Sequence, residues 1–130
     1  MDESELVHRV RAAYDAYNRG DVDAVLDLLH PDVDWRPPPN SLEPHPLRGR
    51  DAVRRYLTPD FFESQRAEPL EVMEEGDRIL VEVRVRARGR GSGVELDMIA
   101  FHLLVIEDDR AVRFEAHVER RQALAAFHDS

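Results

Sequence analysis

The sequence predicts an α+β domain in which three N-terminal helices pack on a curved antiparallel sheet. Apolar residues recur at helical spacing in three segments of the first half of the chain. Strict alternation of apolar and charged residues follows over Arg78–Arg88, and Leu96–Ile106 is the longest apolar run. Helices first and a meander of strands afterwards is the order typical of α+β domains. A sheet that curves around helices leaves a conical cavity, which is the default place to expect a binding site.

Three segments carry the helical pattern. The first runs from Ser4, a suitable N-cap, to Asn18, where Asn-Arg-Gly ends it. The second starts at Asp21 and ends at His30-Pro31, because the residue before a proline disfavours helical geometry. The third follows Asp51, a candidate cap, and ends at Thr58-Pro59.

The strands begin with a short one at Asp32–Arg36, which three prolines close because proline has no N–H to donate. A strand at Leu70–Glu74 turns into Arg78–Arg88, and Leu96–Ile106 pairs with Ala111–Val118 across a polar turn. The proline-rich stretch between the first strand and the third helix is expected to form a loop that rims the pocket. The C-terminal tail, residues 122–127, has a weak helical pattern.

Composition excludes several classes of function. A chain of 130 residues forms one domain, residues 1–130, and a net charge of −9 argues against nucleic acids and anionic membranes as partners. The absence of Cys excludes disulfides and thiolate sites, and no apolar run is long enough to span a bilayer. We therefore expect a cytoplasmic protein whose partner is a small hydrophobic molecule.

His102 is the main candidate for chemistry. It lies in phase with the apolar residues of its strand, so the imidazole should point to the buried side. It could act as general acid or base, or it could be a core histidine satisfied by one hydrogen bond. Asp34 and Arg36 share one face of their strand and would supply a base and an anion clamp if that face is inward. If Trp35 is inward instead, they are surface charges.

The predicted pocket lining combines aromatic and small apolar residues from the helices, the loop and the long strands. Tyr14 and Tyr56 could present hydroxyl groups or serve only as core, and His45 could close the cavity or lie in solvent. The full predicted lining is Tyr14, Trp35, His45, Tyr56, Phe61, Met98, Phe114, Ala116 and Val118. The six histidines are scattered with no metal-ligand spacing, so we expect no metal and no cofactor.

Four segments, taken in order, resemble one known family. They are Tyr17–Asp21, Leu29–Trp35, Leu47–Val53 and the stretch from Val105 to Leu124. Together they are similar to the SnoaL-like branch of the nuclear-transport-factor-2-like superfamily. The resemblance implies a cone-shaped α+β barrel with an apolar pocket and a homodimer through the outer face of the sheet. It does not imply one reaction, because members include cyclases, isomerases, hydrolases and binding proteins.

The catalytic residues of the superfamily transfer poorly to this chain. The general base of the ketosteroid isomerases falls on Arg36, their oxyanion-hole tyrosine on Ala13 beside Tyr14, and its partner carboxylate on His102. The carboxylate of the epoxide hydrolases near the chain end falls on Ala116, and their tyrosine and asparagine on Asp34 and Arg36. Neither mechanism is retained intact.

The sequence leaves three functions open. The first is an isomerase, cyclase or hydrolase that acts by acid–base chemistry on a small apolar carbonyl compound or epoxide. In this enzyme His102 would transfer the proton, Arg36 would stabilise negative charge, and Asp34 would orient or act as base. The second is a binder of a small hydrophobic ligand without turnover, and the third is a dimerisation domain.

Overall fold

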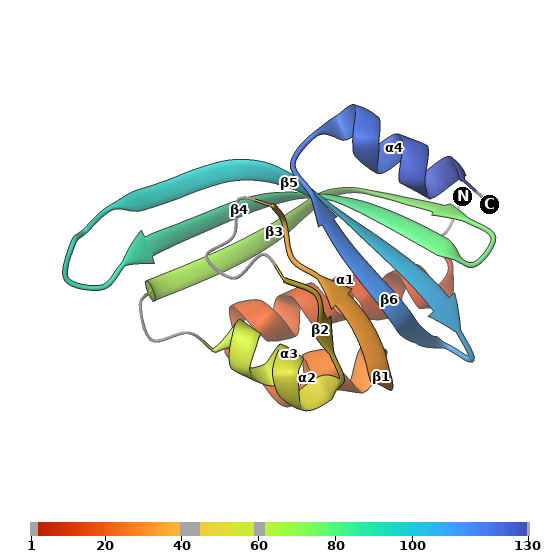
Figure 1. Ribbon diagram of the computed structural model, residues 1–130, viewed down its shortest axis with the longest axis horizontal. Coiled ribbons are helices and arrows are strands. Elements are labelled where there is room, and N and C mark those ends of the chain that lie inside the picture. The colour runs from red at the N-terminus through yellow and green to blue at the C-terminus, as the bar shows by residue number, and fades with distance from the viewer. Residues whose placement is uncertain (1–2, 40–44, 59–61, 130) are drawn as a thin grey trace.

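The computed structural model describes residues 3–39, 45–58 and 62–129, and within them four helices pack on one mixed sheet of six strands (Figure 1). The helices are α1 (Glu5–Asn18), α2 (Val22–Leu28), α3 (Arg50–Leu57) and α4 (Arg120–His128). The strands are β1 (Leu29–Arg36), β2 (Leu47–Arg48), β3 (Phe62–Glu75), β4 (Arg78–Gly89), β5 (Glu95–Glu107) and β6 (Arg110–His117). The predicted α+β class is confirmed.

The sheet has the strand order β2-β1-β6-β5-β4-β3 and is not closed. Strands β3 to β6 form the predicted antiparallel meander. β1 pairs in parallel with β6, so the sheet is mixed and not purely antiparallel. This parallel pair joins strands that are distant in the sequence, and it places β1 beside β6 near the middle of the sheet order.

Local chemistry explains where the helices begin. The Ser4 hydroxyl accepts a hydrogen bond from the backbone N–H of Val7 (3.1 Å), and the Asp21 carboxylate accepts one from Ala24 (3.2 Å). The third helix begins differently from the prediction, because Gly49 at φ 88° is its N-cap residue. Asp51 lies in its first turn, where a carboxylate still interacts favourably with the helix dipole.

Two strands are longer than the sequence predicts. β3 starts at Phe62 and pairs with β4 along most of its length, although its first half is polar and shows no alternation. Its hydrogen bonds come from the ladder with β4, which a single-strand pattern cannot reveal. β1 starts at Leu29, because α2 ends at Leu28 and the chain enters the strand directly.

The inner face of the sheet, defined as the face toward α1, α2 and α3, forms the main core. Val81 and Val83 of β4 and Val33 of β1 are fully buried there, together with Val10 of α1. The side chain of Asn18 fixes the end of α1 to β3: its amide donates to the carbonyl of Ala67 and accepts from the same residue's N–H (both 2.8 Å). This pair of bonds sets the position of α1 over the inner face.

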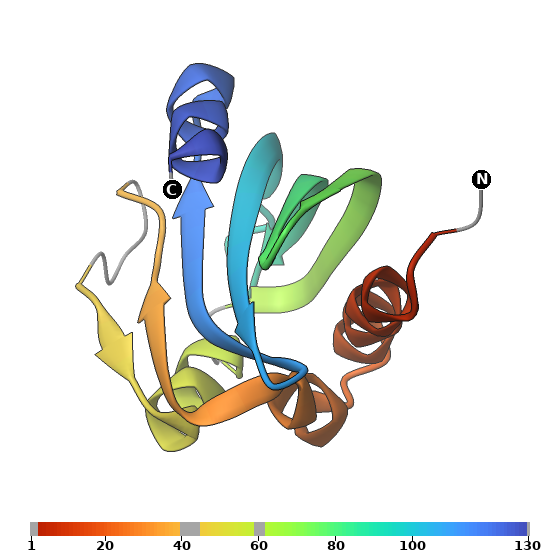
Figure 2. The same cartoon turned by 90° about the vertical axis from the view of Figure 1, so that its right-hand side faces the viewer.

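The outer face carries a second, smaller core under α4. Phe127 and Ala123 of α4 pack with Leu80, Phe101 and Leu103 of the sheet. The views in Figures 1 and 2 place α4 on the opposite side of the molecule from α2 and α3. The C-terminal segment is therefore helical, as its pattern indicates, and it covers part of the outer face. The predicted homodimer through this face stays a prediction, and α4 leaves only the remainder of the face for it.

No helix in the described ranges has the length and apolar character needed to cross a membrane.

Candidate functional site

Strand β1 turns Trp35 inward. Trp35 is 6% exposed and pairs with Phe114 of β6, whereas the side chain of Arg36 is 47% exposed and that of Asp34 24%. Successive side chains of a strand point to opposite faces, so Asp34 and Arg36 lie on the outer face, where they form an ion pair (3.3 Å). The sequence leaves the facing of Asp34 and Arg36 open, and in the structure the large indole takes the buried side. Asp34 and Arg36 are therefore surface charges on the face of the sheet opposite His102.

The inward residues form a continuous row of aromatic rings. Phe114 stacks on Trp35 with 3.8 Å between ring centroids and an interplanar angle of 10°. On its other side Phe114 lies 4.8 Å from the ring of His102, at 56°. Tyr56 of α3 contacts Trp35 at 6.1 Å, and Tyr14 of α1 stacks beside His102 at 5.9 Å. Four residues of the predicted lining, Tyr14, Trp35, Tyr56 and Phe114, thus lie in one row with His102, and two of them, Tyr14 and Phe114, contact its ring. We call this set of five the aromatic row.

His102 and Tyr14 form one hydrogen-bonded pair. The Tyr14 hydroxyl lies 2.6 Å from Nδ1 of His102, and both side chains are partly buried. Ala116 of β6 pairs directly with His102 across the ladder, so its small side chain lies on the same face of the sheet as the imidazole. The pair joins the middle of β5 to α1, so the imidazole plane is fixed by Tyr14 on one side and by Phe114 on the other.

Burial keeps both members of this pair neutral. Burial, more than the nearby His117, lowers the pKa of His102 to about 4, because an imidazolium is poorly solvated among apolar rings. Burial also raises the pKa of Tyr14 well above its usual range. At neutral pH the site therefore holds an uncharged imidazole and an uncharged phenol. Among the residues that the structure describes, no carboxylate contributes to the shift at His102.

The direction of the hydrogen bond follows from what else Tyr14 can reach. A buried hydroxyl group needs an acceptor for its proton, and within the described part of the chain His102 Nδ1 is the one partner of the Tyr14 hydroxyl. We therefore infer that Tyr14 donates to Nδ1 and that the neutral ring carries its own proton on Nε2. The ring then presents an N–H donor on the side away from Tyr14.

The remaining residues of the predicted lining are spread more widely. Met98 is partly buried on the same face of β5 as His102, and Val118 is partly buried just beyond the end of β6. His45 is exposed, as expected for a histidine in solvent, and Phe61 lies outside the described residues.

The sequence analysis does not predict one contact of α1. The hydroxyl of Tyr17, three residues after Tyr14 and on the same helix face, donates to the Gln65 side chain. The spacing of the two tyrosines on α1 was the available signal for it.

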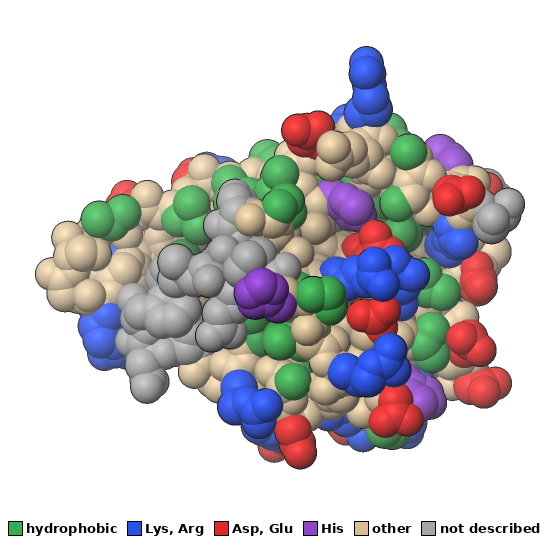
Figure 3. All heavy atoms as spheres, viewed as in Figure 1, with side chains coloured by type: hydrophobic (Ala, Val, Ile, Leu, Met, Phe, Trp, Pro, Cys, Tyr) green, Lys and Arg blue, Asp and Glu red, His purple; other side chains and the backbone are tan. Residues whose placement is uncertain are grey.

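The outer face over β1 and β6 is charged rather than aromatic. Arg113 and His117 both pair with Glu115 (2.6 and 3.1 Å), next to the Asp34–Arg36 pair. Acidic and basic side chains alternate over these strands in Figure 3. A shallow hollow of about 440 Å³ opens beside them, lined by His30, Asp32, Asp34, Arg48, Glu107, Asp108, Val112 and Arg113. Two of the charged side chains that line it, Asp34 and Arg113, form ion pairs with Arg36 and Glu115.

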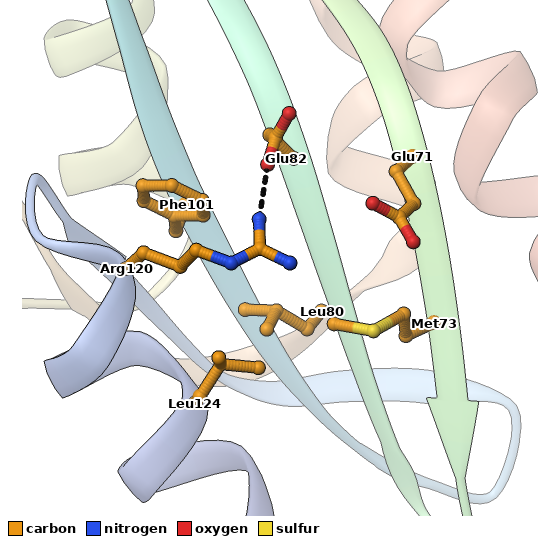
Figure 4. A pocket seen from close by; sticks show the side chains of 7 residues that line it. All are labelled: Glu71, Met73, Leu80, Glu82, Phe101, Arg120 and Leu124. Atoms are coloured by element: carbon orange, nitrogen blue, oxygen red, sulfur yellow. Dashed lines mark hydrogen bonds and ion pairs between the residues drawn. The ribbon is translucent and has the colours of Figure 1, made fainter.

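A second, much smaller hollow lies under α4. Its volume is about 10 Å³, and Arg120 crosses it to donate to Glu82 (2.6 Å) above the apolar side chains of Leu80, Phe101 and Leu124 (Figure 4). This volume accommodates no more than about one water molecule. His102 lines neither hollow.

Comparison with known proteins agrees with the fold. The model of the SnoaL-like domain family matches residues 10–114. A search of curated protein sequences finds no match. Among solved structures, an NTF2-like protein of unknown function from Burkholderia pseudomallei is 29% identical, with a TM-score of 0.79, over 98% of this chain and 100% of that one. A proposed polyketide cyclase from Sinorhizobium meliloti is 27% identical, with a TM-score of 0.68, over 89% and 96% of the two chains.

A third structure, TerC crystallised with polyporic acid, shares the fold at 22% identity, with a TM-score of 0.78, over 98% of this chain and 100% of that chain. The match of the family model covers most of the chain and includes Tyr14, Trp35, His102 and Phe114. The resemblance seen in the sequence is therefore confirmed, and the chain belongs to the SnoaL-like domain family.

Proposed function

We propose that this SnoaL-like protein binds a small, planar, largely apolar carbonyl compound against the aromatic row and polarises its carbonyl group through His102. The observation that carries the proposal is the neutral Tyr14–His102 pair, hydrogen-bonded at 2.6 Å within an apolar face of the sheet. The rings provide flat apolar contact, and Nε2 of His102 provides one directional donor.

The hydrogen bond from Nε2 is stronger here than it would be in water. Phe114 lies against the imidazole, Tyr14 occupies its Nδ1 edge, and the lower local dielectric of this apolar surrounding strengthens a hydrogen bond. Because Tyr14 holds Nδ1, the donor is already oriented before a ligand arrives. Preorganised donors of this kind stabilise negative charge that develops on a carbonyl oxygen.

The lowered pKa favours a donor role for His102 over a role as base. A ring with a pKa of about 4 accepts a proton poorly at neutral pH, whereas its N–H still donates. In an isomerisation or cyclisation, the same donor would stabilise the enolate form of the substrate. Asp34 and Arg36 take no part in this proposal, because they lie on the outer face.

Two structural relatives support this substrate class. TerC was crystallised with the small molecule polyporic acid, and the relative from Sinorhizobium meliloti is a proposed polyketide cyclase. Binding without turnover is the second candidate. It is favoured by the absence, within the described residues, of a carboxylate that acts on His102 and could serve as base. Both candidates require the same hydrogen bond.

The test compares two ligands of nearly the same shape, acetophenone and isopropylbenzene, of which only the first has a carbonyl oxygen. Binding would be followed by NMR on ¹⁵N-labelled protein. We expect the protein to bind acetophenone about 3- to 10-fold more tightly, the range that one net hydrogen bond provides. His102→Phe should abolish this preference, and His102→Gln should retain it, because an amide can accept from Tyr14 and donate to the ligand. Equal affinity for the two ligands, or a preference that survives His102→Phe, would show that the proposal is wrong.

A further inference from the structure

One edge of the sheet is the free side of β3. The strand order ends at β3, which pairs with β4 alone, and no strand lies beyond it (Figure 2). β3 has 14 residues, whereas β2 at the opposite edge has two. The backbone groups on the free side of an edge strand accept a further strand from another chain unless something blocks them. β3 is therefore the edge to which a strand could be added.

The half of this edge formed by residues 62–69 is closed. The Asn18 side chain occupies both the backbone N–H and the C=O of Ala67 (2.8 Å each). Pro69 has no N–H to donate, and the register shift between Pro69 and Glu71 interrupts the regular ladder. A partner strand could not pair continuously along this half.

The half formed by residues 70–75 is open. Glu75 and Arg78 close a hairpin with a two-residue turn, so they form a hydrogen-bonded pair. Because hydrogen-bonded and non-hydrogen-bonded pairs alternate, Val72 and Glu74 point their N–H and C=O groups away from β4. The described part of the chain supplies no hydrogen-bond partner for these four groups. Leu70 is 47% exposed, so an apolar side chain lies at the same half.

The charge beside the open half selects its occupant. Glu71 and Glu74 are exposed and form no ion pair with a described residue, and Glu75 lies 3.1 Å from His128. Two copies of this edge would bring the same carboxylates together, so pairing of β3 with a second β3 is disfavoured. A strand that carries Lys or Arg would instead place cations beside them.

We propose that residues 70–75 of β3 are a docking edge for a basic, extended segment of a partner protein, which adds to the sheet as a further strand. Hydrogen bonds to the backbone of Val72 and Glu74 provide the affinity, and the carboxylates provide the preference for basic side chains. The whole of β4 separates this edge from His102 on β5. The inference therefore goes beyond the proposed function and does not depend on it.

The experiment measures amide hydrogen exchange on ¹⁵N-labelled protein with the probe peptide acetyl-RVRVRV-amide. In the free protein, the amides of Val72 and Glu74 should exchange faster than those of Met73 and Glu75, which donate to β4. A saturating concentration of the peptide should slow exchange at Val72 and Glu74 by at least about 10-fold, because these amides acquire an acceptor. The acidic peptide acetyl-EVEVEV-amide should not slow it.

Two controls separate backbone pairing from charge. The fully N-methylated form of the basic peptide keeps the charge but has no N–H, so it should bind about 10-fold more weakly. Glu74→Gln removes one exposed charge and should weaken binding of the basic peptide by about 2- to 5-fold. Glu74→Pro also removes the outward N–H without breaking a bond to β4, and it should weaken binding by a further 3- to 10-fold or about that.

Exchange at Val72 and Glu74 that the basic peptide leaves unchanged would overturn the inference. Equal affinity for the N-methylated and the unmodified peptide would do the same, because the peptide would then be held by charge alone. A Glu74→Pro variant that binds as tightly as Glu74→Gln would also contradict strand addition. If Glu74→Pro fails to fold, exchange in the unmodified protein decides.

Discussion

Acidification from about pH 7.5 to about pH 4 is expected to lower the free energy of unfolding by about 3 kcal/mol through His102 alone. The folded pKa of His102 is about 4, and the ordinary value is 6.5. Each unit of difference between the folded and unfolded states corresponds to about 1.4 kcal/mol. Urea unfolding followed by the fluorescence of Trp35 over this pH range would measure the effect.

The sign follows from proton uptake. Above about pH 6.5 the imidazole is neutral in both the folded and the unfolded chain, so it adds no pH dependence. Between about pH 6.5 and pH 4 the unfolded chain binds a proton that the buried ring in the folded chain does not bind. Stability therefore falls as the pH falls through this window, and the contribution of His102 levels off below about pH 4.

His102→Gln is the matched control, because Gln is neutral throughout and can still accept from Tyr14. The difference in pH dependence between this variant and the unmodified protein isolates His102 from the other titrating groups. Two of these, Asp97 and Glu3, have pKa values lowered by Arg partners, so their contributions to stability also fall as the pH falls, and they do so equally in both proteins. Identical pH profiles for the two proteins would contradict the burial of His102.

Phe114→Ala should cost about 3–5 kcal/mol of stability, the range for removal of a buried aromatic side chain. Phe114 is 6% exposed and lies between Trp35 and His102, so its loss removes contacts to both. The cavity would also let water reach the imidazole, and the pKa of His102 should rise toward its ordinary value. Urea unfolding measures the first effect, and an NMR titration of the histidine measures the second.

Phe101→Ala is the control for this variant. Phe101 is equally well buried, at 7% exposed, but it packs under α4 on the outer face. It should destabilise the fold by a similar amount and leave the pKa of His102 near 4. If both variants moved the pKa of His102 equally, the shift would reflect general loosening of the fold and not the aromatic row.

The fold class and the inward position of His102 could be predicted because both depend on local patterns. The alternation over β5 places His102 in phase with Met98 and Leu104 without any knowledge of other strands. The strand β1 is different. Only a few of its residues alternate between apolar and polar. This short pattern allows either Trp35 or the pair Asp34 and Arg36 to face inward. Stacking on Phe114, which is remote in the sequence, favours the indole.

The Tyr14–His102 pair could not be predicted for the same reason. The two residues are 88 positions apart, and the contact depends on where α1 crosses the sheet. That position is set by contacts such as those between Asn18 and the backbone of Ala67, which a helical or strand pattern does not contain. The same holds for the polar first half of β3, whose regular structure comes from its pairing with β4. Local sequence thus predicts which elements form, and contacts distant in sequence decide which side chains meet.

The central claim is that His102 is a neutral hydrogen-bond donor held by Tyr14, and ¹⁵N NMR of the histidine ring nitrogens over a pH series tests it most directly. The spectrum of His102→Gln would identify the signals of His102. We expect a pKa of about 4 and, near pH 7, a proton on Nε2 with Nδ1 accepting from Tyr14. A pKa near the ordinary value of 6.5, or a neutral ring with its proton on Nδ1, would contradict the account.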